Sequence, residues 1–443
     1  TPNTGRLVWN QNDQELKLLV DGFGLNVRSG DFGAIGDGVA DDRPAIQRAI
    51  DVCFAQGGGN VFLPSGSYRL NSGSLLLRDK VNLIGTGPQS TRLLIGNQRN
   101  QPAITDEGLL ATTPYAFGVV RLAHFAVDGG GDQNPSLHAA IATSAYYSIF
   151  ENLQITNCSG HGFAVGNPYM SNYASQNQFL GCRIANCGQA GIYFDIHAVD
   201  CVVAHCFIRR CRYGVYINNG GMRVVNNALF DHEEAAVMIT QTPVSGLIAF
   251  NDLNFNRKGN IVISRTTATT AEKWSQLLVT NNVILGDALE ANAVYDAILI
   301  SSEVPAGISK VSVIGNKIYT PETGNRFRYG VHFQQNVIQS ACLANHIQDC
   351  AAGAYYVAPS CTDIQIEPVQ GAVVNTPALP RSGEAVQNTS GVPVTIYLTG
   401  GVVERVLIGP TDTGLTAGMF RLPAWKTITI YYTAAPAWNW VAD

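Results

Sequence analysis

The stretch SGDFGAIGDGVADDRPAIQRAI, residues 29–50, places four aspartates and four glycines ahead of an apolar run with helical spacing. The aspartates miss the alternating spacing of an EF-hand calcium loop, and no glutamate closes one. No Lys-Ser or Lys-Thr pair follows the last glycine, as a phosphate-binding loop requires. We therefore interpret the stretch as structural, with Asp41 or Asp42 as helix cap and Pro44 in the first turn. The predicted buried helix face consists of Ile46, Ala49, Ile50 and Cys53.

The same residues carry a resemblance to a known family. DFGAIGDGVADDRPAIQRAID, followed by GGGNVFLPSGSYRL, resembles the opening of the pectate-lyase-like right-handed β-helix proteins, which include many phage tailspikes and polysaccharide depolymerases. The resemblance covers residues 29 to about 85. It implies that this segment is a capping helix with the first strands, and not a catalytic loop.

Composition favours short strands joined by tight turns. Of the 443 residues 14% are charged and 45 are glycine. The net charge of −5 gives no electrostatic basis for binding nucleic acid or an anionic membrane. No apolar run approaches the ~20 residues that span a bilayer, so we expect no membrane insertion. No signal peptide precedes the first predicted strand, and we expect synthesis in a host cytoplasm.

The ten cysteines are spaced as a structural repeat and not as a disulfide framework. Cys182 and Cys206 are 24 residues apart, as are Cys187 and Cys211. We predict free thiols buried inside stacked coils, in keeping with a reducing compartment. Paired C-x-x-C clusters are absent from the sequence, so neither a zinc site nor any other metal or cofactor is expected.

A repeat of roughly 22 to 29 residues sets the architecture. It is visible in FENLQITNCSGHGFAV (150–165), FLGCRIANCGQAGIYF (179–194) and VAHCFIRRCRYGVYI (203–217). Each copy joins short strands through a polar turn, and such coils must stack to bury their apolar sides. The predicted fold is all-β: a right-handed parallel β-helix, its handedness implied by the resemblance, with an N-terminal capping helix and a small C-terminal β-sandwich. The predicted domains are a lead-in segment (1–28), the helix (29–370) and the sandwich (371–443).

The C-terminal segment has a different sequence pattern: short stretches that alternate apolar and polar residues, typical of strands, lie between turns of Gly, Pro and Thr. Its end, AAPAWNWVAD, resembles the C-terminal modules of tailspike-like proteins, which implies a role in trimerisation or glycan contact. Trp438 and Trp440 are expected in a core or subunit interface more often than in sugar stacking.

Alternation along GIYFDIHAVD predicts which side chains leave the core. Ile192, Phe194 and Ile196 would point inward, and Tyr193, Asp195 and His197 outward. Later coils would continue this polar and aromatic outer face, which suits sugar rings and hydroxyls, with Tyr216, Asn218, Met238, Thr240, His332 and Gln334.

Glycan hydrolysis requires two carboxylates about 5 to 9.5 Å apart. The turn FDHEEAAVM is the densest acidic spot, and Asp195 lies two coils before it. We predict Asp195 and Glu234 as acid and base or nucleophile, with Asp231 and Glu233 as substitutes. Glu233 is assigned to the inner column of Cys158, Cys187 and Cys211, where a charge is costly unless it is paired. The predicted substrate-binding residues are His197, Tyr216, Arg212, Asn218 and Tyr193.

Two other activities would use outward-facing residues of these coils: pectin hydrolysis and elimination. The Gly-His-Gly at 160–162 resembles part of the polygalacturonase pattern, but the companion Asn-Thr-Asp and Arg-Ile-Lys motifs are absent from the sequence. Elimination on a uronic-acid polymer stays open, with His197 or Tyr216 as base and Arg209 or Arg212 neutralising the carboxylate.

The resemblance implies a tailspike-like depolymerase acting on a bacterial surface polysaccharide, either O-antigen or capsule. It also implies a homotrimer on a virion tail that acts at the bacterial outer surface. The competing hypothesis is a receptor-binding protein that holds glycan without cleaving it. We expect glycoside hydrolysis by two carboxylates in preference to elimination, while the sugar and the linkage stay open.

Overall fold

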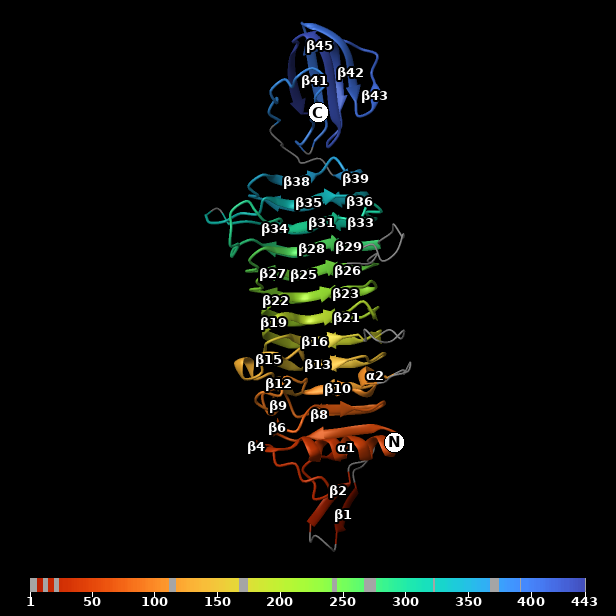
Figure 1. The fold of residues 1–443 in the computed structure, drawn as a ribbon, viewed down its shortest axis with the longest axis vertical. Coiled ribbons are helices and arrows are strands. Elements are labelled where there is room, and N and C mark those ends of the chain that lie inside the picture. Colours follow the sequence, from red (N-terminus) through yellow and green to blue (C-terminus); the bar gives the residue numbers. More distant parts are fainter. Residues whose placement is uncertain are drawn as a thin grey trace.

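The structure is a computed structural model in which parallel strands stack into one long right-handed β-helix (Figure 1). It describes the whole chain except residues 1–5, 11–14, 20–23, 111–116, 167–173, 241–244, 267–275, 322, 367–373, 391 and 443. The predicted fold class is confirmed. The predicted boundary at residues 370 and 371 lies outside the described residues.

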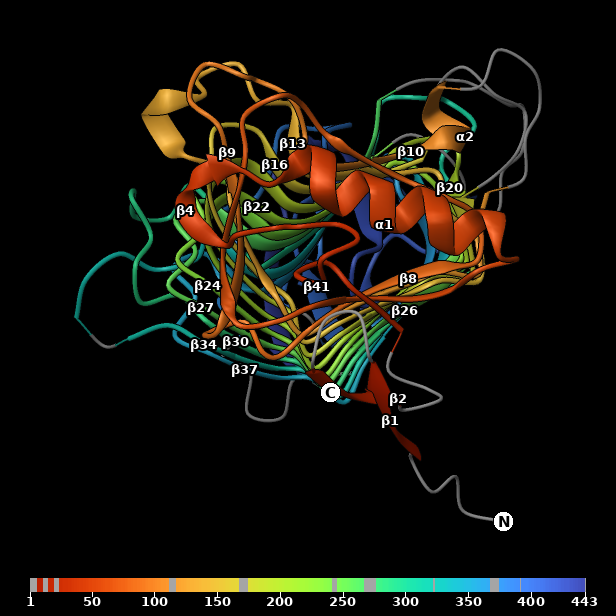
Figure 2. The ribbon, with the colours of Figure 1, turned by 90° about the horizontal axis from the view of Figure 1, so that it is seen from below.

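Helix α1 (Arg43–Ala55) lies across the N-terminal end of the stack (Figure 2). Pro44 is in its first turn, and the four residues predicted for its inner face are buried. Of the two aspartates predicted to cap the helix, Asp41 accepts at Oδ1 from the N–H of Arg43, the first helical residue, at 3.3 Å, whereas Asp42, the N-cap by position, makes no side-chain cap hydrogen bond. Its carboxylate instead accepts hydrogen bonds from the N–H groups of Ile35 (2.6 Å) and Gly36 (3.1 Å), which fixes the preceding loop.

Each complete coil contributes strands to three faces. The back face is one continuous parallel sheet. Its strands are β3 (Leu25–Asn26), β5 (Gly59–Leu63), β8 (Val81–Gly85), β11 (Arg121–Ala123), β14 (Ile149–Glu151), β18 (Gln178–Leu180), β21 (Val202–Ala204), β23 (Met222–Val225), β26 (Ser245–Ala249), β29 (Gln276–Thr280), β32 (Ile308–Ser309), β33 (Val311–Ile314), β36 (Val337–Leu343) and β39 (Thr362–Ile366).

The side face and the front face share two long strands, β19 (Arg183–Phe194) and β22 (Phe207–Ile217), whose register shifts between Cys187 and Ala190 as they pass from one face to the other. The side face also holds β4 (Asp37–Asp41), β6 (Gly66–Leu70), β9 (Thr91–Ile95), β12 (Ala126–Asp128), β15 (Gln154–Cys158), β24 (Ala228–Phe230), β27 (Asp252–Asn254), β30 (Val283–Leu285), β34 (Lys317–Tyr319) and β37 (His346–Gln348).

The front face carries the candidate site. It consists of the second halves of β19 and β22 together with β7 (Leu75–Leu77), β10 (Ile104–Asp106), β13 (Ala139–Thr143), β16 (His161–Val165), β25 (Ala235–Thr240), β28 (Gly259–Arg265), β31 (Ile298–Ser302), β35 (Tyr329–Gln335) and β38 (Gly353–Val357). Small elements outside the three faces are the antiparallel pair β1 (Arg6–Asn10) and β2 (Glu15–Leu19), α2 (Glu107–Leu110), a 3-10 turn (Gly131–Gln133), β17 (Ala174–Ser175) and β20 (Ala198–Val199).

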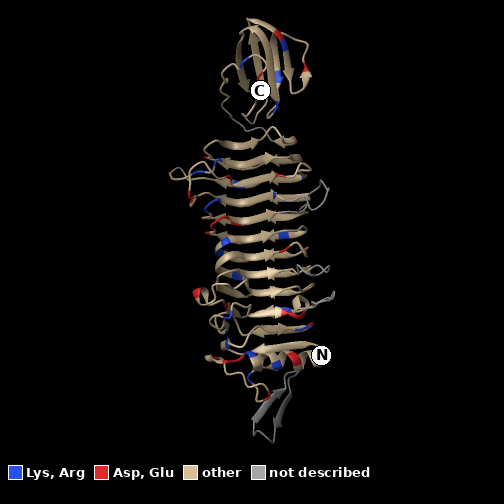
Figure 3. Cartoon of the chain, viewed as in Figure 1, with Lys and Arg blue, Asp and Glu red and all other residues tan. Residues whose placement is uncertain are grey.

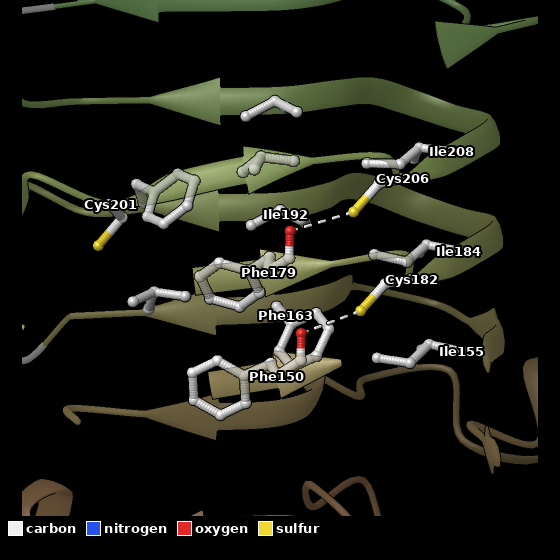
Figure 4. Packing of buried hydrophobic residues seen from close by; sticks show 14 of the residues in the cluster. Phe150, Ile155, Phe163, Phe179, Cys182, Ile184, Ile192, Cys201, Cys206 and Ile208 are labelled. Atoms are coloured by element: carbon white, nitrogen blue, oxygen red, sulfur yellow. Dashed lines mark hydrogen bonds between the residues drawn. The ribbon is translucent and has the colours of Figure 1, made fainter. Parts of the chain in front are cut away.

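The interior is a set of stacked columns (Figure 4). Phe150 and Phe179 stack with ring centroids 4.8 Å apart, and Phe163 meets both rings edge-on. Burying each such side chain contributes about 2 to 3 kcal/mol. The thiols of Cys182 and Cys206 each donate to a backbone carbonyl one coil below, at 3.4 Å. All ten cysteines are free and eight are buried, which confirms the thiol prediction; Cys350 and Cys361 are half-buried.

The structure corrects the column assignment at the acidic turn. Arg209 pairs with Phe230, so the residue that follows Cys158, Cys187 and Cys211 in the inner column is His232, which is fully buried. Glu233 is exposed, and the prediction that it occupies this column is wrong. The coil alignment was one residue out because this coil has no cysteine to mark its register.

Beyond β39 the chain forms an antiparallel β-sandwich with its own apolar core. One sheet contains β40 (Ala385–Gln387), β45 (Thr427–Ala434), β42 (Val402–Ile408) and β43 (Thr411–Asp412); the other contains β44 (Gly418–Leu422), β41 (Val394–Thr399) and β46 (Ala437–Ala442). Trp440 is buried in this core, and Trp438 packs against it edge-on while donating from its ring N–H to Pro377 O.

Charged side chains are sparse on the strands, and many lie at the turns along one edge of the helix (Figure 3). Among the described residues, no helix combines the length and the apolar character needed to cross a bilayer.

Candidate functional site

A groove of about 400 Å³ opens on the front face over β16, β19 and β22. Because alternate residues of a strand point to opposite sides, the outward side chains of neighbouring coils align into rows that line it. The lining consists of His138, His161, Gln189, Tyr193, Arg212, Tyr213, Tyr216 and Asn218. Four of the five predicted substrate-binding residues therefore lie in one groove; the fifth, His197, lies just past the end of β19.

The rings of the groove form a continuous aromatic surface. His161 stacks on Tyr193 with centroids 4.5 Å apart and meets His138 edge-on at 5.4 Å. Tyr193 continues to Tyr216 at 5.6 Å, and Tyr216 to Tyr213 at 5.0 Å. Such a surface offers sugar rings an apolar contact, while the hydroxyl and imidazole edges supply hydrogen bonds.

His161 is held as a neutral ring. Burial, assisted by neighbouring His138, lowers its pKa to about 4. The backbone N–H of Ala190 donates to its Nδ1 at 3.2 Å, so the neutral ring carries its proton on Nε2. His161 therefore presents a hydrogen-bond donor at neutral pH and not a base.

Tyr193 is tied into a polar network. The Asn218 amide donates to the Tyr193 hydroxyl at 2.9 Å, and Thr240 donates to the Asn218 carbonyl oxygen. Burial, with the nearby Asp195 carboxylate as the next cause, raises the pKa of Tyr193. Its hydroxyl is therefore protonated at neutral pH and, because the Asn218 donor occupies one lone pair, its own proton is directed elsewhere.

Asp195 follows β19 directly, and its side chain is only 13% exposed. Its carboxylate accepts from the backbone N–H of His197 at 2.6 Å, and the His197 ring lies 3.9 Å away. Burial outweighs these contacts and raises the Asp195 pKa. Gly166, at φ +124°, packs so closely on this carboxylate that any Cβ there would collide with it. The fold thus holds one partly buried carboxylate, a stronger base than an ordinary aspartate, beside the groove.

The structure does not bring the predicted acid pair together. Asp195 aligns with Asn218 and Thr240 at the end of the front strands, whereas Glu234 precedes β25. Six residues separate these two positions along the strand, roughly 20 Å at 3.3 Å per residue. Glu234 instead pairs with Lys258 at 2.9 Å. Asp231 pairs with Arg210 at 3.2 Å on an exposed turn.

A second cluster on the front face was not predicted as a unit. The Asp296 carboxylate accepts two hydrogen bonds from the Arg328 guanidinium, at 3.0 and 2.6 Å, and lies 2.8 Å from His332 Nδ1. These partners hold the pKa of Asp296 below its ordinary value despite burial. His332 was predicted to point outward, and it does so from the front strand, yet the cluster covers it. Its partner Asp296 lies in a stretch without a clear repeat, so the sequence offered little signal.

Among the described residues, no group of three or more His, Cys, Asp or Glu side chains is arranged to hold a metal ion.

Comparison with known proteins identifies the family. Residues 25–293 match the model of the family described as rhamnogalacturonase A/epimerase, pectate lyase-like. This chain belongs to that family. Membership confirms the resemblance found in the opening residues and places the chain among polysaccharide-acting enzymes built on the parallel β-helix.

Two curated relatives show the range of the family. A capsule K30/K69-specific depolymerase of Klebsiella phage K64-1 is 26% identical over 278 residues, which cover 60% of this chain and 34% of the depolymerase. Mannuronan C5-epimerase AlgE3 of Azotobacter vinelandii is 54% identical over 67 residues, 14% of this chain and 4% of the epimerase. The chain thus spans a minor part of each of these relatives.

Two solved structures share the fold. The A-module of the A. vinelandii mannuronan C-5 epimerase AlgE4 superposes with a TM-score of 0.57 at 19% identity, covering 77% of this chain and all of the module. The Dettilon tailspike protein superposes with a TM-score of 0.55 at 14% identity, covering 94% of both chains.

Proposed function

We propose that this chain is a phage depolymerase that binds a uronic-acid-containing bacterial surface polysaccharide, capsule or O-antigen, in the front groove and cleaves it by elimination. The observation that carries the proposal is the composition of the groove. The acid Tyr193 and the donor His161 line the groove, and the partly buried carboxylate of Asp195 lies beside it, two residues from Tyr193. Glu234 lies roughly 20 Å from Asp195 along the strand direction.

In the proposed reaction Asp195 removes the proton at C5 of a uronic acid residue. The electron pair of the C5–H bond forms the C4=C5 double bond, the C4–O bond breaks, and the leaving oxygen takes a proton from the Tyr193 hydroxyl. Negative charge develops on the uronate carboxylate as the proton leaves, and the Nε2–H of His161, whose ring stacks on Tyr193, stabilises it. Asp195 and Tyr193 are two residues apart on the same side of a strand, about 6.6 Å along it, so acid and base can flank one sugar.

The relatives support this chemistry from two directions. The Klebsiella phage relative is a capsule depolymerase by name, and the Azotobacter relatives include an alginate lyase and epimerases of mannuronan. Removal of the C5 proton of a uronate is the shared first step of elimination and C5 epimerisation. The Klebsiella phage relative supports location on a virion tail, acting at the bacterial outer surface. We propose that the protein acts there as a homotrimer.

The test is incubation of the protein with mannuronan and with purified capsules and O-antigens, followed by product size and ultraviolet absorbance. Shortened chains that gain the absorbance of a conjugated double bond support elimination. Shortened chains without it, together with inactivity of Glu234→Gln, would establish hydrolysis. Binding without shortening would establish a receptor-binding protein that lacks catalysis.

A further inference from the structure

The cluster around Arg328 lies on the same face as the Asp195 groove and in line with it. One register column of the front face runs through both: it consists of Tyr193, Tyr216, Met238, Val262, Leu299, His332 and Tyr356. Tyr193 and Tyr356 are therefore six coils apart, roughly 29 Å at ~4.8 Å per coil. Between them the column is aliphatic, which leaves two separate aromatic regions on one straight path along the helix axis.

The upper region is built in the same way as the lower one. Tyr329 and Tyr356 stack with centroids 5.0 Å apart, and His332 meets both rings edge-on at 5.3 and 5.1 Å. The Arg328 guanidinium lies over Tyr329, 5.4 Å from the ring centroid. We call these four residues with Asp296 the distal cluster.

Arg328 is fixed in place while part of it faces outward. Asp296 holds its Nε and Nη2, and the side chain keeps 36% of its surface exposed, whereas Asp296 is 2% exposed. Among the described residues Nη1 has no hydrogen-bond partner. A guanidinium held in this way loses little conformational entropy when it binds a carboxylate or a hydroxyl.

A row of charges joins the distal cluster to the groove. Five residues occupy one register column at the start of successive front-face segments: Arg212, Glu234, Lys258, Tyr295 and Arg328. Glu234 Oε1 lies 3.9 Å from Arg212 and 2.9 Å from Lys258, and Lys258 is 4.0 Å from Glu290, which accepts from the Tyr295 hydroxyl. The cations thus recur at every second coil, roughly every 10 Å.

This period matches an acidic sugar chain. In an extended 1,4-linked chain one sugar advances about one coil step, and successive sugars face opposite sides, so every second carboxylate meets the same rim. We propose that the distal cluster is a remote subsite that binds sugar residues about six positions from the cleavage point of the same uronic-acid chain. This subsite rests on the proposed function and deepens it, because it makes affinity depend on chain length.

The test uses mannuronan oligomers fractionated by length and the Asp195→Asn protein, so that the oligomers are not degraded. The dissociation constant should fall by about tenfold or more once the oligomer exceeds roughly six residues. Adding Tyr356→Ala should abolish that gain while short oligomers bind as before. Tyr356→Phe should keep the gain, and Tyr319→Ala, on the side face one coil below, is the matched control.

Affinity that does not change with length, or a gain that survives Tyr356→Ala, would overturn the subsite while leaving the elimination activity standing. Failure of every oligomer to bind, with no elimination product from any polyuronate, would instead refute the proposed function, and the subsite with it.

Discussion

Asp195 owes its raised pKa to burial, and a base must be ionised to act. The ionised fraction grows as pH rises through that pKa, so the acid limb of kcat/KM should lie at a higher pH than the 3.8 of an ordinary aspartate. A pH profile on the substrate identified by the panel measures it. A rate that is flat as pH falls through 3.8 would exclude Asp195 as the base.

The pKa of His161 is shifted in the opposite direction, below its ordinary value. Its folded pKa of about 4 lies below its ordinary value of 6.5, so between these values the unfolded chain binds a proton that the folded chain does not. Stability from this group is complete above pH 6.5 and is lost as pH falls toward 4, by up to roughly 1.4 kcal/mol per unit. Unfolding midpoints at several pH values, compared with those of His161→Gln, measure the effect. Equal pH dependence of the two proteins would contradict it.

At the scale of elements, the stack depends on columns that change chemistry along its length. The column of Leu153, Cys182 and Cys206 continues as buried asparagines: Asn227, Asn251, Asn282 and Asn316. Each amide donates to a carbonyl in the coil below and to the next asparagine, for example Asn251 Nδ2 to Val224 O (2.8 Å) and to Asn282 Oδ1 (2.9 Å). The asparagine ladder provides hydrogen-bond partners for backbone groups at this turn. In the lower coils the thiols of Cys182 and Cys206 donate to backbone carbonyls at the same turn.

Breaking this ladder should be costly. Asn251→Ala leaves the N–H of Asn227 and the carbonyl of Val224 without this partner inside the stack, and each such group costs about 1 to 3 kcal/mol. We expect a loss of about 3 kcal/mol or more in the free energy of unfolding, measured with urea. Asn97→Ala, on an exposed turn, should change it by less than about 0.5 kcal/mol. A loss for Asn251→Ala no larger than that of the control would show that the ladder contributes little.

The sequence predicted the coils well where cysteines and alternating apolar residues marked their register. Cys187 and Cys211 identified one column correctly, and Tyr193, Tyr216 and Asn218 were assigned to the outer face by alternation alone. The next coil is shorter, 21 residues from Cys211 to His232 against 24 from Cys187 to Cys211, and nothing in it marks where the residues were lost. Because of this error the sequence analysis placed Glu233 in the core and interpreted the acidic turn as catalytic.

The candidate site was half predictable for a related reason. Alternation predicts which side chains point outward, but it does not give the distance between them along the strand. That distance is what separates Glu234 from Asp195. It also cannot show that His161 leans onto Tyr193, or that Arg328 reaches back to Asp296, since both contacts depend on how side chains pack between coils.

For the whole molecule, the proposed homotrimer has a physical basis in the exposed phenylalanines of the side face. Phe250 and Phe255 flank β27 in left-handed conformations, at 59% and 49% exposure, and Asn226 and Asn281 hold the turn position of Phe250 in adjacent coils. Strained, exposed rings are retained where a partner covers them. Light scattering should give three times the chain mass of 47.4 kDa, and Phe250→Asn with Phe255→Asn should lower it. A single-chain mass for the unaltered protein would contradict the trimer.

The measurement that tests the central claim most directly compares Asp195→Asn with Asp231→Asn on the polysaccharide that the unaltered protein degrades. Both substitutions replace a carboxylate by an amide, but Asp195 lies beside the front groove, while Asp231 pairs with Arg210 on an exposed turn. We predict that Asp195→Asn lowers the rate of product absorbance by about a hundredfold or more, with the fold intact, and that Asp231→Asn leaves it unchanged. Full activity in Asp195→Asn would contradict the account.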